Sequence, residues 1–312
     1  MQQTLFCVLL LLSSLTVRAE DYEALPYDRL QQKSVHNAYQ RKESLSDQLE
    51  VYQLRSLELD IFPSKRGQRA PAMDWFVYHS PSDQKSSVNF LSDGLDVLKK
   101  FHDEDPNHEV ITVFMDIKAP FQSDGHLAED LDQLLRSSLG SMLWSPSDLM
   151  ARCPESFTLQ NSVQKAACDW PSLQELRGRI LFVLTSAPIL DYVLNGSKAT
   201  QRAAFIAPQI TSVTAIENFP FAVFFNMEKS VALRGEVLQG LRQRNLIGRT
   251  WDVNDARTWK SLASLPIQHI ATDKVNTQKD PWSTTLDAEG HVFRMIPLSF
   301  TEYESASGYS VL

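Results

Sequence analysis

Short apolar runs with the spacing of β-strands alternate along the chain with longer stretches that have a helical pattern. The strand-like runs are Lys33–His36, Ser56–Ile61, Val110–Ile117, Ile180–Thr185, Ala204–Ala207, Phe221–Met227, Leu246–Trp251 and His269–Asp273. The helix-like segments include Leu91–His102, Gly125–Leu139, Ser172–Leu176 and Lys229–Arg244. Eight strands that alternate with helices over about 250 residues predict an α/β fold, a (β/α)8 TIM barrel. A doubly wound sheet is the alternative, but the glycine-rich phosphate turn typical of that fold is missing from the sequence.

The first residues have the pattern of a secretory signal peptide. An apolar run over Leu5–Leu12 is followed by Val17 and Ala19, small residues at the −3 and −1 positions of a cleavage site after Ala19. We therefore expect residues 1–19 to be removed and residues 20–312 to form a single barrel domain that is secreted or periplasmic. An uncleaved membrane anchor is the alternative, although the run is short for a membrane span.

Charge and cysteine content indicate which partners and which cross-links to expect. The formal net charge of −8 lacks the basic footprint that nucleic-acid binding needs, so no nucleic-acid partner is expected, and the chain is expected to be monomeric. Cys7 leaves with the signal peptide, so Cys153 and Cys168 remain as a pair in an oxidising compartment. A disulfide between these two cysteines is the natural interpretation.

Two carboxylates lie two residues apart in the strand Ser56–Ile61. Strand periodicity places Leu57, Leu59 and Ile61 on one face, and Glu58 and Asp60 on the other, which points into the barrel. Two ionised carboxylates in a barrel interior are costly unless a cation neutralises them, so a hard divalent ion is expected beside them. An exposed edge strand with alternating charges is the alternative.

The strand Val110–Ile117 repeats this spacing at its carboxyl end, where barrel enzymes carry their chemistry. Asp116 lies between apolar residues and would complete an oxygen-rich metal site. Lys118 would place an ammonium group against a phosphate oxygen. A structural ion pair with a neighbouring strand is the other interpretation of these two residues.

Two histidines follow apolar segments, His36 after the first strand and His79 after Trp75–Tyr78. Such a pair beside an acidic metal site suits cleavage of a phosphodiester, in which one group accepts a proton and another donates one. Either histidine alone would more often be structural. His102, His108, His126 and His291 are expected at the surface, and His269, which begins the last strand, is expected to be structural.

Four motifs make the sequence similar to a known group of enzymes. They are His36-Asn37-Ala38-Tyr39, Arg55–Asp60, Val77-Tyr78-His79 and Asp116-Ile117-Lys118. Together they resemble the phosphatidylinositol-specific phospholipase C superfamily, and most closely its secreted calcium-dependent branch. Supporting similarities lie at 170–178, 249–252 and 271–273, so the resemblance covers roughly residues 30–275.

The resemblance implies a role for each matching residue. Asn37, Glu58, Asp60 and Asp116 would bind Ca2+, or Mg2+ in its place. His36 and His79 would be the acid–base pair, and Lys118 would contact phosphate. The implied reaction is attack of the inositol 2-hydroxyl on phosphorus, which releases diacylglycerol and a cyclic inositol phosphate. The substrate would be a phospholipid or a glycerophosphodiester, reached through transient contact with a membrane surface. Trp75, Phe76 and Phe121 are candidate aromatic residues for that contact, with core packing as the alternative.

Two departures keep other functions open. Asp116 stands where cytosolic relatives carry glutamate, and Trp251 stands where the calcium-dependent branch is expected to have arginine. The segment Trp251–Asn254 is instead similar to glycerophosphodiester phosphodiesterases, and a sphingomyelinase D-like enzyme shares the two histidines and the Asp-x-Lys pair. A catalytically dead binding protein on the same barrel is the alternative from another class.

Overall fold

The barrel strands begin where the apolar runs of the sequence begin, and most of their bounds agree with the prediction within a few residues. The computed structural model describes residues 22–164, 168–186, 188–286 and 290–296. Its barrel strands are β1 (Leu30–Val35), β2 (Ser56–Phe62), β6 (Ile111–Ile117), β7 (Ile180–Thr185), β8 (Phe205–Ile206), β9 (Phe224–Met227), β10 (Ile247–Thr250) and β11 (His269–Thr272). The predicted signal peptide lies outside the described residues.

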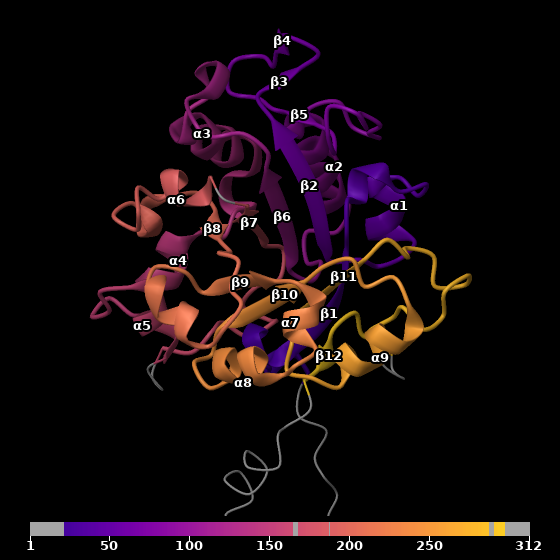
Figure 1. The fold of residues 1–312 in the computed structure, drawn as a ribbon, viewed down its shortest axis with the longest axis vertical. Coiled ribbons are helices and arrows are strands. Elements are labelled where there is room, and N and C mark those ends of the chain that lie inside the picture. Colours follow the sequence, from indigo (N-terminus) through magenta and orange to yellow (C-terminus); the bar gives the residue numbers. More distant parts are fainter. Residues whose placement is uncertain (1–21, 165–167, 187, 287–289, 297–312) are drawn as a thin grey trace, which may run out of the picture.

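These strands form two parallel sheets that face each other, as Figure 1 shows. One sheet has the order β2-β6-β7-β8 and the other β1-β11-β10-β9, each with a short antiparallel strand at its edge, β5 (Phe76–Val77) and β12 (Arg294–Met295). The sheets meet at two seams. At one, the Ser56 hydroxyl donates to Ser34 Oγ at 2.8 Å, and at the other Asn226 N donates to the Pro208 carbonyl at 3.0 Å. The fold is therefore the predicted TIM-barrel class, with regular strand pairing interrupted at the seams.

Helices cover the outer faces of the sheets. They are α1 (Leu45–Glu50), α2 (Leu91–Glu104), α3 (Ala128–Leu139), α4 (Pro146–Ala151), α5 (Leu159–Gln164), α6 (Ile189–Tyr192), α7 (Lys229–Ala232), α8 (Glu236–Arg242) and α9 (Ala256–Ala263). The leucines of β2 pack outward against α1 and α2, and a β-carbon on Gly94 of α2 would lie 3.4 Å from Leu59. This packing leaves Glu58 and Asp60 on the inner face, as the alternation of β2 predicts, and excludes the exposed edge strand.

Two predicted helices are wrong in detail. The segment Ser172–Leu176 forms turns, because the backbone N–H groups of Leu173 and Gln174 donate to Leu25 and Glu23 of the amino-terminal segment. The segment Lys229–Arg244 is split into α7 and α8, because Gly235 adopts a left-handed conformation with φ 76°.

Aromatic side chains fill the barrel between the two sheets. Phe114 of β6 contacts Phe224 of β9 and the His269 ring of β11, with ring centroids 6.5 and 4.9 Å apart. Within the connection between α3 and β7, which contains α4 and α5, a disulfide joins Cys153 and Cys168, as predicted. Among the described residues, no helix is long and apolar enough to span a membrane.

Candidate active site

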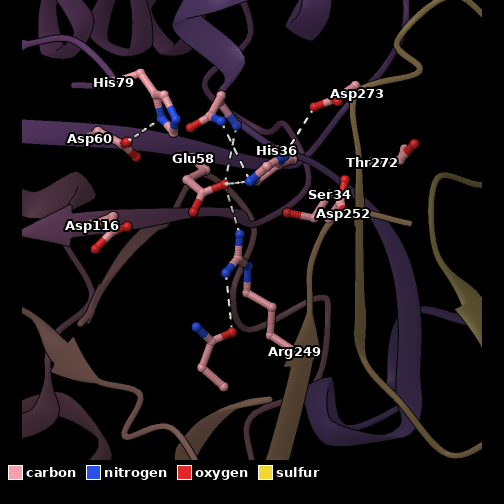
Figure 2. Close-up of polar contacts among 12 residues, drawn as sticks. Ser34, His36, Glu58, Asp60, His79, Asp116, Arg249, Asp252, Thr272 and Asp273 are labelled. Atoms are coloured by element: carbon pink, nitrogen blue, oxygen red, sulfur yellow. Dashed lines mark hydrogen bonds and ion pairs between the residues drawn. The ribbon is translucent and has the colours of Figure 1, made fainter. Parts of the chain in front are cut away.

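The polar residues predicted from the strand ends surround one cavity at the carboxyl end of the barrel. Its volume is about 200 Å³. Six of the seven predicted residues line it, and Asp60 lies directly behind them, bonded to His79 and Lys118. The full lining is His36, Asn37, Glu58, His79, Asp116, Lys118, Thr185, Ser186, Gln209, Asn226, Arg249 and Trp251. Figure 2 shows Glu58 between His36 on one side and Asp60 and Asp116 on the other.

Three carboxylates converge at the wall of this cavity. Oxygen atoms of Glu58, Asp60 and Asp116 lie within 4.8 Å of one another, and β2 and β6 bring Asp60 and Asp116 side by side in register. Burial, and next the charge of Glu58, raise the pKa of Asp60 to about 8. Its Oδ1 atom is buried and has no hydrogen-bond partner among the described residues. An unsatisfied buried carboxylate oxygen among other carboxylates is what a hard divalent cation would bind, so the residues present fit a metal site.

Glu58 is held in place from two directions. Arg249 of β10 makes an ion pair with Glu58 at 2.9 Å, and the backbone N–H of Asn37 donates to the same oxygen at 3.1 Å. Burial acts to raise the pKa of Glu58, but Arg249 and His36 hold it below its usual range. The Arg249 guanidinium also lies 4.5 Å from the Phe114 ring, so the cation is fixed between an aromatic face and the acid.

His36 directly follows β1 and lies between two acids. Its Nδ1 atom is 3.0 Å from Asp273, and its Nε2 atom is 3.9 Å from Glu58. Burial acts to lower the pKa of His36, but the hydrogen bond with Asp273 and the charge of Glu58 raise it overall. Arg41 anchors Asp273 at 3.0 Å. The ring is thus oriented through Nδ1, and Nε2 is the nitrogen directed to the cavity side.

His79 reaches the same cavity from the other sheet. It follows β5, which pairs antiparallel with the end of β2, and its Nδ1 atom lies 3.2 Å from Asp60. Its side chain is 43% exposed, so a molecule in the cavity could reach it from solvent.

Lys118 lies among the carboxylates. Its Nζ atom is 3.0 Å from Asp60 and 2.5 Å from Asp116. Burial acts to lower the pKa of Lys118, but these two carboxylates raise it. The ion pair with a neighbouring strand that the sequence left open is therefore present, and the same ammonium also lines the cavity.

Asn37 forms a backbone turn at the edge of the site. Its φ of 50° is left-handed, a conformation that asparagine tolerates better than most residues. Its side-chain oxygen accepts a hydrogen bond from Tyr39 at 3.2 Å. The backbone turn directs the Asn37 N–H toward Glu58, so this residue contributes to the site through main chain and side chain.

Sequence comparison places the chain among known enzymes. The profile of the calcium-dependent phosphoinositide phospholipase C family matches residues 76–251, more than half of the chain. The chain belongs to this family. It is accordingly a phosphoric diester hydrolase of the phospholipase C type, and a binding protein on a dead barrel is not the interpretation that the family supports. A search of curated proteins gives no match.

Solved structures agree with this phospholipase C fold. A calcium-dependent phosphoinositol-specific phospholipase C from Pseudomonas sp has a TM-score of 0.73 at 21% identity, over 88% of this chain and 96% of that one. The phosphatidylinositol-specific enzyme from Streptomyces antibioticus has a TM-score of 0.65 at 20% identity, over 82% and 97%. At these sequence identities the structural similarity establishes the fold of this chain.

The phospholipase C site contains residues that the sequence did not single out as functional. Arg249 and Asp273 orient Glu58 and His36, Asn226 accepts a hydrogen bond from Arg249 at 3.2 Å, and the Ser186 hydroxyl donates to Asp116. Arg249 left one signal, since it is a charged residue inside the apolar run Leu246–Trp251, two positions from the strand end. No comparable signal marks Asn226 or Ser186.

Four expectations about other residues need correction. His108 and His126 are buried rather than at the surface; His108 contacts the Phe101 ring, and His126 packs edge-on against Trp75 at 5.2 Å. Trp75 and Phe76 are also buried, Trp75 in the main hydrophobic core and Phe76 in a small cluster with Ala70 and Tyr78. These two aromatic side chains are core residues and are not available for a lipid surface. His269 is buried, as expected for a structural histidine.

Proposed function

We propose that this chain is a secreted enzyme that cleaves phosphatidylinositol into diacylglycerol and a cyclic inositol phosphate and that requires calcium. The observation that carries the proposal is the group of three carboxylates, Glu58, Asp60 and Asp116, flanked by two histidines at a barrel mouth. Among the described residues, the buried Oδ1 of Asp60 has no hydrogen-bond partner. The family name supports calcium and the inositol lipid. Magnesium is less suited, because it demands a regular octahedron, whereas calcium accepts irregular sets of six to eight oxygens.

Asn37, Glu58, Asp60 and Asp116 are the residues that would hold the ion. When bound, calcium would supply positive charge that offsets the negative charge of the phosphoryl oxygens. Asp60 contributes a buried oxygen with no other partner, and the Arg249 ion pair keeps Glu58 ionised and oriented.

The two histidines would move the protons of the reaction. As the inositol 2-hydroxyl oxygen forms its bond to phosphorus, one histidine accepts the hydroxyl proton. The other donates a proton to the diacylglycerol oxygen as the bond between that oxygen and phosphorus breaks. Each ring has its Nδ1 atom directed to a carboxylate, Asp273 for His36 and Asp60 for His79, so Nε2 is the nitrogen that we assign to the substrate. In His36 that nitrogen now lies 3.5 Å from the Asn37 side-chain nitrogen and 3.9 Å from Glu58. Lys118 would contact the phosphate from the cavity wall once its ammonium turns from the carboxylates.

A lipid series tests this proposal. We expect hydrolysis of phosphatidylinositol in calcium, loss of hydrolysis in a chelator, and recovery on re-addition of calcium. Phosphatidylcholine, sphingomyelin and glycerophosphodiesters serve as competing substrates. Faster release of glycerol 3-phosphate or choline than of inositol phosphate would contradict the choice of substrate, and turnover in the chelator would contradict the metal requirement.

Export is tested separately. Residues 1–19 are proposed as a signal peptide on their sequence pattern alone, with a mature chain that begins at Glu20. Mass spectrometry of the exported protein should find Glu20 at the amino terminus. Recovery of the full-length chain in the membrane fraction would favour the uncleaved anchor.

A further inference from the structure

A short hairpin projects from the barrel mouth directly after β2. Strands β3 (Ser64–Lys65) and β4 (Gln68–Arg69) pair antiparallel, and Figure 1 shows them at the extremity of the molecule, beyond β5. The chain then returns through residues 70–75 into β5 and reaches His79. The hairpin is thus joined to the cavity wall at both ends.

The hairpin carries three cations and borders a groove. The groove has a volume of about 630 Å³ and is lined by Lys65, Arg66, Gln68, Arg69, Ala70, Pro71, Phe76, Asn89 and Phe90. Among these described lining residues there is no carboxylate, although acidic residues outnumber basic ones by 38 to 30 in the whole chain. The groove is therefore a local positive surface on an acidic protein.

Few acids among the described residues compensate these charges. Arg66 donates to the neutral side chain of Gln84 at 2.7 Å, and Lys65 lies 5.8 and 5.5 Å from the rings of Phe76 and Tyr78. Arg69 lies 3.9 Å from Asp124 but is 71% exposed, so this pair is weak and screened by salt. The exposed Arg66 and Arg69 and the half-buried Lys65 therefore remain available to an anionic partner.

An apolar tip lies beside the cations. Pro71, Ala72 and Met73 are exposed on the connection that follows β4, with Met73 at 38%. Cations next to exposed apolar side chains suit the interface of a lipid bilayer, where charged headgroups border acyl chains. A soluble anion would need the cations alone.

The hairpin is also held in a fixed orientation. Its turn residues, Arg66 and Gly67, have φ values of 51° and 77°, the left-handed pair of a tight two-residue hairpin turn. The Tyr78 hydroxyl donates to the Ser64 carbonyl at 2.6 Å, and Ala70 N donates to the Pro63 carbonyl at 2.8 Å. A surface that binds this hairpin would therefore lie at a defined angle to the cavity.

We infer that the β3–β4 hairpin, with Pro71–Met73, docks the protein onto bilayers that contain anionic lipids and so presents the barrel mouth to the lipid headgroups. The inference deepens the proposed function, since it names the surface from which the site would take its substrate. It also replaces the buried Trp75 and Phe76 as the means of membrane contact.

Vesicle sedimentation tests the inference without turnover. The lipids are phosphatidylcholine alone, and phosphatidylcholine mixed with phosphatidylglycerol, an anionic lipid without inositol. We expect the wild-type chain to bind the mixed vesicles, and the Lys65→Gln/Arg66→Gln/Arg69→Gln variant to bind them more weakly by roughly fivefold for each charge removed. High salt should reduce the wild-type binding.

A charge-matched control uses cations of two helices outside the hairpin. Lys99→Gln/Lys100→Gln/Lys260→Gln removes the same charge from α2 and α9 and should bind like the wild type. Because Lys65 packs on two rings, Arg66→Gln/Arg69→Gln is the second hairpin variant, and thermal unfolding confirms that each variant is folded. Turnover of monomeric short-chain phosphatidylinositol should be the same in all of them.

Three results would overturn the inference. The first is that the hairpin variants bind phosphatidylglycerol vesicles as strongly as the wild type does. The second is that the control variant loses as much binding as the hairpin variants. The third is that the wild type binds soluble polyglutamate but not vesicles. If the protein hydrolyses no inositol lipid, the proposed function is contradicted. The vesicle binding would still test the docking surface, because it is measured without turnover.

Discussion

His36 and His269 lie on adjacent strands of one sheet, at opposite ends of the barrel interior. His36 follows β1 at the mouth, between Asp273 and Glu58. His269 begins β11 at the floor, where its Nδ1 atom is 3.1 Å from the Ser56 hydroxyl and its Nε2 atom is 3.3 Å from the Tyr27 hydroxyl. Carboxylates therefore surround one ring, and neutral hydroxyls surround the other.

The surroundings shift the two rings in opposite directions. Burial, with the charge of Arg249, lowers the pKa of His269 well below its ordinary value, whereas the pKa of His36 is raised. Near neutral pH a protonated His36 is stabilised and a protonated His269 is not. The comparison teaches that a histidine inside this barrel acquires a chemical or a structural role from the charges that face it.

The largest expected effect is on turnover at the mouth. His36→Ala should lower kcat by about 10²–10⁴-fold, because a proton-transfer group is lost, while its thermal unfolding stays close to that of the wild type. Steady-state hydrolysis of phosphatidylinositol measures the first and calorimetry the second. A variant that unfolds but retains its specific activity would reverse the roles assigned to the two histidines.

Neutralising Asp60 should act on calcium binding. Asp60→Asn is expected to weaken calcium binding by roughly tenfold to 100-fold, because it removes a charged ligand from the group of three carboxylates. Without calcium, the same change should stabilise the fold, since it relieves repulsion with Glu58. Calcium titration and chelator-treated unfolding check the two parts. Unchanged affinity would exclude Asp60 from the ligand set.

At the floor the expected effect is on stability. His269→Ala should lower the free energy of unfolding by about 3 kcal/mol, because it leaves a cavity against Phe114 and removes a partner from Ser56. The kcat of the folded fraction should not change. Chemical denaturation gives the first value, and a specific activity far below that of the wild type would point to a role in catalysis.

The smallest effect concerns pH. The folded pKa of His269 lies below its unfolded value of about 6.5, so the unfolded chain binds a proton first as the pH falls. The stability that this residue contributes is present above pH 6.5 and is lost below it, by up to about 1.4 kcal/mol per pH unit. Denaturation of the wild type and of His269→Gln between pH 7 and 5 should differ in slope by this amount. Parallel curves would contradict the assignment.

Much of this arrangement could be predicted because it depends on local pattern. The predicted Ile180–Thr185 coincides with β7, and the alternation of β2 correctly placed Glu58 and Asp60 inward. The floor network and the Arg249–Glu58 ion pair were not predicted, because they join strands far apart in sequence and depend on how the two sheets close. The hairpin of β3 and β4 was not predicted either, because strands of two residues are too short to show a periodic pattern of apolar residues.

Calcium titration by calorimetry, followed by a turnover assay on the same samples, tests the account of the mouth most directly. We predict that the wild type binds calcium and hydrolyses phosphatidylinositol, and that His36→Ala binds calcium with similar affinity without hydrolysis. Asp60→Asn should bind calcium about tenfold to 100-fold more weakly and show little hydrolysis at the calcium concentration that saturates the wild type. Hydrolysis by His36→Ala at the wild-type rate, or hydrolysis by the wild type in the absence of bound calcium, would contradict the account.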